Sequence, residues 1–77
     1  MDGKRQLRIP VRDLGCGGAG AITIERALAA TGGVRRVYVN PATETAYIDY
    51  DPTEADDWLL IEAIERAGYR AGHPVER

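Results

Sequence analysis

Apolar residues follow two different periods along this chain. Residues 7–12 read Leu-Arg-Ile-Pro-Val-Arg, and strict alternation of this kind predicts a strand with one buried face. Residues 20–30 place Ala, Ile and Leu three or four positions apart, which predicts an amphipathic helix. Gly32 and Gly33 follow it directly, and glycine is common just beyond a helix end. The chain therefore begins with a strand and a helix.

A hairpin and a second helix follow. Residues 34–39 and 46–50 are rich in valine, isoleucine and tyrosine and flank the polar turn 40–43. This pattern predicts two antiparallel strands joined by a short loop. A second helix is expected from an N-cap at Asp56 to a stop at Gly68.

Residues 69–71 can add a short last strand. The resulting order, βαββαβ, predicts an α+β fold, the ferredoxin-like sandwich with a four-stranded antiparallel sheet and two helices on one face. Seventy-seven residues supply one small hydrophobic core. Residues 1–77 are therefore expected to form a single domain with a core over about residues 6–71 and flexible termini.

Composition narrows the class of protein. Hydrophobic residues make up 44% of the chain and charged residues 29%, ordinary globular values that argue against disorder and against a membrane span. The longest apolar run, residues 58–61, is far shorter than the roughly 20 residues that cross a bilayer. One cysteine forms no internal disulfide and no apolar signal segment begins the chain, so a cytoplasmic location is expected. A net charge of -2 argues against nucleic acid as a partner.

Three strings of residues together resemble a known family. They read Gly-Val-Arg-Arg-Val-Tyr-Val-Asn at 33–40, Ala-Tyr-Ile-Asp-Tyr-Asp-Pro at 46–52 and Leu-Ile-Glu-Ala-Ile-Glu-Arg-Ala-Gly-Tyr at 60–69. Over about residues 6–71 the chain resembles a heavy-metal-associated domain, as found in copper chaperones and at the N-termini of heavy-metal-transporting P-type ATPases. The resemblance implies the fold predicted above and a role in metal ion transport.

The family's chemistry depends on an M-x-C-x-x-C loop between the first strand and the first helix, because soft ions such as copper(I) prefer thiolate ligands. Here Leu14 falls on the methionine position, Cys16 on the first cysteine and Ala19 on the second. The second thiol is absent. Tyr69 matches the residue that the family places near the metal.

A second alignment frame gives the same result. The string Ile-Glu-Arg-Ala-Leu at 24–28 resembles the family's first helix, and aligning on it shifts the loop by one residue. The two cysteine positions then fall on Gly17 and Gly20. No C-x-x-C pair exists in either frame.

Cys16 leaves two function hypotheses open. A thiol beside the N-terminus of a helix is favoured as the thiolate, so Cys16 can supply one ligand to copper(I) or another soft metal ion. The second thiolate would then come from a partner metal-transport domain or from a second copy bridged through Cys16. The domain would bind and transfer metal, more weakly than a two-thiol site. The alternative is a metal-silent domain without a cofactor that serves regulation or protein interaction, alone or within a membrane transporter.

Other chemistry finds little support. His73 and Asp13 are expected in solvent rather than on a metal, and the glycines around Cys16 lack the ending of a phosphate-binding P-loop. Glu25, Glu62 and Glu65 alternate with arginines as on a solvated helix face. No histidine accompanies Cys16 as a nucleophile would require. An enzyme is not expected.

The remaining candidates lie on the surface. Tyr38 and Tyr47 are placed by strand alternation on the open face of the sheet, beside Arg36 and Asp49. They are candidate partner-binding residues, and simple cross-strand pairing is the alternative. Trp58 is expected to close the edge of the core at the start of the second helix.

Overall fold

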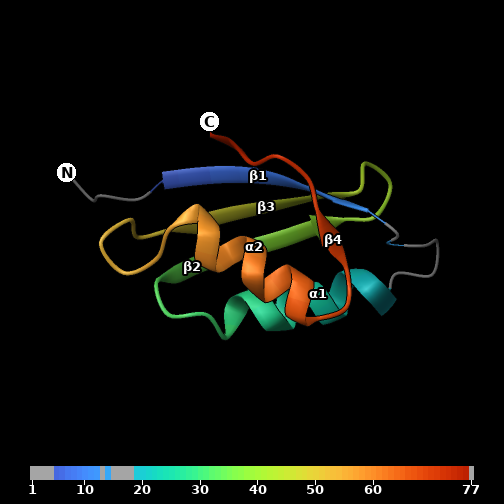
Figure 1. Cartoon of the computed structure of the whole chain (residues 1–77), viewed down its shortest axis with the longest axis horizontal. Helices are drawn as coiled ribbons and strands as arrows, with labels where there is room; N and C mark the ends of the chain where they lie inside the picture. Colours follow the sequence, from blue (N-terminus) through green and yellow to red (C-terminus); the bar gives the residue numbers. More distant parts are fainter. Residues whose placement is uncertain (1–4, 13, 15–18, 77) are drawn as a thin grey trace.

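The computed structural model describes residues 5–12, 14 and 19–76, and the whole chain is drawn in Figure 1. Its elements are β1 (Arg5–Arg12), α1 (Ala19–Ala29), β2 (Val34–Asn40), β3 (Thr45–Tyr50), α2 (Asp57–Arg66), β4 (Arg70–Ala71) and β5 (Val75–Glu76). The strands pair antiparallel in the order β2-β3-β1-β4. Both helices cover one face of this sheet (Figure 1), so the predicted ferredoxin-like fold is confirmed.

A short strand that the sequence did not predict extends the sheet. β5 pairs antiparallel with β1, with Val75 opposite Arg8, on the edge of β1 where β4 also pairs. Two residues are too few for alternation to be detected, which is why the prediction ended at Ala71. Within the described residues, no helix has the length and apolar character needed to span a bilayer.

The core lies between the sheet and the two helices. Its fully buried side chains come from every long element, and the largest are Ile9, Val11, Ile24, Leu28, Val39, Ile48, Leu60 and Ile64. The predicted N-cap of α2 is confirmed, because the Asp56 carboxylate accepts a 3.0 Å hydrogen bond from the Leu59 amide. Trp58 was wrongly expected at the core edge. Its side chain is 71% exposed, since the helical stripe formed by Leu60 and Ile64 turns it outward.

Glu25 was expected on a solvated helix face, and the structure corrects this. Its carboxylate accepts a 2.8 Å hydrogen bond from the amide of Val39 in a partly buried setting. β2 is an edge strand, so this amide has no neighbouring strand on that side. Glu25 therefore joins α1 to β2 and gives the Val39 amide, on the open edge of the sheet, a hydrogen-bond acceptor.

Glu25→Ala should destabilise the fold by about 1.5 kcal/mol, the lower value for a hydrogen bond to a charged group, because the Val39 amide loses its acceptor. Denaturant unfolding followed by circular dichroism measures the change. Glu62→Ala is the matched control: among the described residues Glu62 pairs only with Arg66, across 3.8 Å on the surface of α2, so the change should cost about 0.5 kcal/mol or less. Equal losses in the two variants would contradict a structural role for Glu25.

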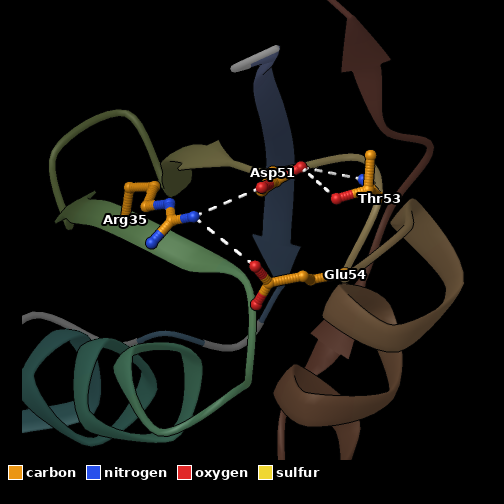
Figure 2. A network of polar contacts seen from close by, with 4 residues as sticks. All are labelled: Arg35, Asp51, Thr53 and Glu54. Carbon is orange, nitrogen blue, oxygen red and sulfur yellow. Dashed lines mark hydrogen bonds and ion pairs between the residues drawn. The ribbon is translucent and has the colours of Figure 1, made fainter. Parts of the chain in front are cut away.

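A polar network fastens the corner between β3 and α2 (Figure 2). Asp51 accepts hydrogen bonds from the hydroxyl and the amide of Thr53, at 2.7 and 2.9 Å, and from Arg35 of β2 at 3.2 Å. Arg35 also lies 3.5 Å from Glu54. Gly33, at φ +94°, fits under this corner because it has no side chain. A Cβ at this position would lie only 2.8 Å from the Cβ of Glu54.

These contacts lower the pKa of Asp51. The hydroxyl of Thr53 contributes most, followed by the Thr53 amide, with Arg35 adding less. Because the pKa is lower in the folded chain than in the unfolded one, the resulting stabilisation is present above the unfolded pKa. It is lost as the pH falls through the folded value.

Thr53→Ala should therefore raise the pKa of Asp51 toward its ordinary value. Acid unfolding of the variant should also begin at a higher pH than in the wild-type domain. An NMR titration of the Asp51 carboxyl carbon measures the shift directly. Thr43→Ala, a change at an exposed residue of the hairpin turn, serves as the control and should leave Asp51 unaffected. An unchanged pKa in Thr53→Ala would show that Arg35, not Thr53, sets it.

Candidate metal centre

The candidate site lies where β1 leads into α1. Leu14 follows β1 and is buried, with 5% of its surface exposed, so this end of the loop is anchored in the core. α1 begins at Ala19, whose side chain is exposed, and continues with the buried Gly20. Cys16 and Gly17 lie outside the described residues, as does Asp13. The nearest described residues on either side of the predicted ligand, Cys16, are therefore Leu14 and Ala19.

Tyr69 follows the C-terminal end of α2 and contributes to this site from there. α2 ends in two C-cap hydrogen bonds, from the Gly68 amide to the Glu65 carbonyl at 3.0 Å and from the Tyr69 amide to the Ile64 carbonyl at 3.3 Å. Gly68 takes φ +98°, which glycine adopts without strain. This turn reverses the chain, so that the Tyr69 ring packs against the core.

Three of the predicted site residues meet at Gly20. An ideal Cβ on Gly20 would lie 2.8 Å from the carbonyl oxygen of Leu14 and 2.8 Å from the hydroxyl oxygen of Tyr69. The Leu14 side chain is also near, at 3.2 Å. The space of a side chain at this position is thus already filled. Leu14, Gly20 and Tyr69 form one contact, which we call the Gly20 contact.

The donor set at the described positions is poor. Among residues 5–12, 14 and 19–76, no group of three His, Cys, Asp or Glu side chains is placed to hold a metal ion. His73 is exposed in the link between β4 and β5. Leu14, Ala19 and Gly20 carry no donor in their side chains, and the phenol of Tyr69 is a poor ligand for a soft ion. These described residues alone do not fit a metal site.

The match to known proteins covers this loop and both helices. The family model described as the heavy-metal-associated domain matches residues 8–70. The chain belongs to this family. The recognition made from the strings at 33–40, 46–52 and 60–69 is confirmed, and the heavy-metal-associated (HMA) domain here carries a loop with one cysteine.

Individual relatives of the HMA domain are parts of ion pumps. The chain is 41% identical over 68 residues to a probable copper-transporting ATPase of Arabidopsis thaliana, covering 88% of this chain and 7% of that protein. It is 31% identical over 74 residues to a manganese-exporting P-type ATPase of Mycobacterium tuberculosis, covering 96% and 10%. The crystal structure of a copper-binding domain from the P-type ATPase HMA7 superposes with a TM-score of 0.88 at 26% identity, covering 95% and 97%. The chain thus spans a small part of the curated relatives it matches.

The structure brings together some of the residues predicted around the site. Leu14 and Gly20 lie against Tyr69, which is far from both in the sequence. Ile22 is 54% exposed, so it lies outside the buried stripe of α1, which includes Ala21, Ile24 and Leu28. Sequence reasoning gave no sign that Leu14 and Tyr69 fill the space beside Gly20. The glycine content of the loop conceals it, because glycine also marks open turns.

Gly20→Ala should destabilise the domain by about 1–3 kcal/mol, the cost of forcing a methyl group into a filled site. Unfolding by urea, followed by tryptophan fluorescence, measures it. Gly32→Ala is the matched control, because nothing lies within 4 Å of a Cβ there. Removing the hydroxyl in a Gly20→Ala, Tyr69→Phe double variant should recover part of the loss. A stability equal to that of Gly32→Ala would contradict the Gly20 contact.

Proposed function

We propose that this HMA domain binds a soft metal ion at the loop between β1 and α1 and transfers it in metal ion transport. Membership of the family over residues 8–70 carries the proposal. The copper-binding and copper-transporting relatives support copper(I) as the ion. The manganese-exporting relative introduces a second ion, but manganese prefers carboxylate and carbonyl oxygen. The loop between β1 and α1 contains one carboxylate, Asp13, and one thiol, Cys16.

In this proposal Cys16 is the only thiolate that the domain contributes. Leu14 and Tyr69 flank the loop and shield one side of it, in line with their packing at Gly20. A partner metal-transport domain supplies the second thiolate, and the ion moves by exchange of one sulfur ligand for another. A homodimer bridged through Cys16 is the other source of a second sulfur. The domain then acts in the cytoplasm as a carrier or as part of a membrane transporter, and it performs no catalysis itself.

One observation favours a second candidate, a metal-silent domain. Gly20, one of the two positions on which the second cysteine can fall, has its side-chain space filled by Leu14 and Tyr69. A scaffold packed in this way holds its shape without a metal. In this candidate the single domain, with its core over about residues 6–71, serves regulation or assembly of a larger protein.

Copper(I) titration under reducing conditions, against a competing chelator, distinguishes the two. The wild-type domain should bind weakly and Cys16→Ala should not bind. Ala19→Cys should bind copper(I) at least about 100-fold more tightly than the wild-type domain, because the new thiol is itself a ligand. Groups that only hydrogen-bond to a metal ligand already change metal affinity by about 10- to 100-fold. Ala19 is exposed at the first position of α1, so the new thiol meets no packed neighbour and completes a C-x-x-C pair.

Gly20→Cys is the matched control, because it adds the same thiol one residue further along. Its Cβ would crowd Leu14 and Tyr69, so this variant should lose stability and gain little affinity. Backbone amide shifts locate the bound ion and should be confined to residues 13–20 and Tyr69. Wild-type protein whose amides do not respond to copper(I), alone or with a thiol partner, would favour the metal-silent domain.

A further inference from the structure

Charge is unevenly distributed over the molecule. Strand register places Arg8, Arg12, Arg36 and Arg70 on the outer face of the sheet, away from the helices, and all four are exposed. Among the described strand residues, Asp49 of β3 is the one carboxylate on this face. Among the described residues, none of the four arginines takes part in an ion pair. This face is cationic although the whole chain has a net charge of -2.

Two of these arginines oppose each other directly. Arg12 of β1 is the register partner of Arg70 of β4, and like charges directly opposite on a sheet are destabilising. The described part of the chain places no carboxylate against them. An anion supplied from outside the molecule would relieve this repulsion.

An apolar platform lies among the arginines. Register aligns Val75, Arg8, Tyr47 and Tyr38 in one row across four strands, and the two tyrosine rings stack with centroids 6.1 Å apart and planes inclined by 18°. Tyr38 is 54% exposed and Val75 is 49% exposed. Beside them is a shallow hollow of about 290 Å³, lined by Arg8, Pro10, Thr45, Tyr47 and Val75. We call the outer face of the sheet, which carries the four arginines and this apolar platform, the cationic sheet face.

The opposite character appears at the start of α2. Residues 51–65 contain six carboxylates and no cation. Arg35 and Arg66 pair with three of these carboxylates. Asp56, Asp57 and Glu65 have no ion pair within the described chain. Directly after Asp57 come two apolar side chains, Trp58, which is 71% exposed, and Leu59, which is 41% exposed.

We propose that the cationic sheet face binds the start of α2 of a second copy of this chain. The two surfaces match in charge and in apolar content: arginines meet Asp56 and Asp57, and the tyrosine platform with its hollow meets Trp58. Tryptophan, tyrosine and arginine are also the residue types most enriched at the energetic centres of interfaces. Both helices cover one face of the sheet (Figure 1), and strand register and exposure place these arginines on the other face. One molecule therefore cannot bring its own two surfaces together.

The contact is weak and directional. A standard interface buries about 800 Å² on each partner, about a sixth of the 4972 Å² surface of this chain, whereas the start of one helix offers less. Association is therefore expected in the range of about 10 µM to 1 mM and should weaken as salt screens the charges. Because different surfaces meet, the arrangement is head to tail and each end stays open to a further copy.

Sedimentation velocity over this concentration range, at low and high salt, tests the proposal. The wild-type chain should gain apparent mass with concentration at low salt and lose it at high salt. A sheet variant, Arg36→Glu with Tyr38→Ser, and a helix variant, Asp57→Lys with Trp58→Ser, should each weaken association at least about tenfold. All four side chains are exposed, so thermal unfolding should show that both variants fold. Ile22→Ser, which removes an exposed apolar side chain of α1, is the matched control and should associate like wild type.

Mixing the two variants gives the sharpest result. The sheet variant keeps an intact α2 start and the helix variant keeps an intact sheet face, so together they should form a one-to-one pair that cannot grow. Failure of the mixture to pair would overturn the proposal, as would a wild-type chain that stays monomeric at about 1 mM. Association abolished by Cys16→Ser would also overturn it, in favour of a dimer bridged by sulfur. Shifts on the sheet face that appear only with added polyglutamate would overturn it in favour of another acidic protein.

Discussion

The packing of Leu14, Gly20 and Tyr69 is the constraint on which the candidate-site end of this domain depends. It joins the end of β1, the start of α1 and the turn after α2, because all three approach one position that lacks a side chain. The reversal at Gly68 delivers Tyr69 there. The loop that carries Cys16 therefore lies between two packed positions, the buried Leu14 and the buried Gly20 next to Ala19. Such packing limits the reorganisation that binding of an ion would require.

The same packing distinguishes the two positions on which the family's second cysteine can fall. Ala19 and Gly20 are neighbours, yet their surroundings differ: the first is exposed and the second is buried against Leu14 and Tyr69. A thiol is tolerated at one position and crowded at the other. Membership of the HMA family describes the scaffold, whereas the proposed metal chemistry would depend on one residue of the loop, Cys16.

Much of the fold was predictable from local patterns. The alternation in residues 7–12 and the helical stripe ending in Leu60 and Ile64 are confirmed, as is the cap at Asp56, because each rests on neighbours within a few residues. The failures involve distant partners. The bond from Val39 to the Glu25 carboxylate joins residues 14 apart, and nothing in the helix period distinguishes Glu25 from a solvated glutamate. Trp58 was misplaced because a large apolar ring was assumed to reach the core, although its position two residues before Leu60 puts it on the side of α2 away from the buried stripe.

By itself, the sequence determined the order of elements from β1 to β4, the family and the number of thiols in the loop. These follow from hydrophobic period, short strings and a count of one cysteine. Only the tertiary structure decided which residues meet at Gly20 and how the charges divide between the sheet face and the start of α2. Both depend on chain segments that lie far apart in sequence and are brought together by burial of a common core. Hydrophobic burial is not directional, so the partners of a given side chain are set by the packed whole.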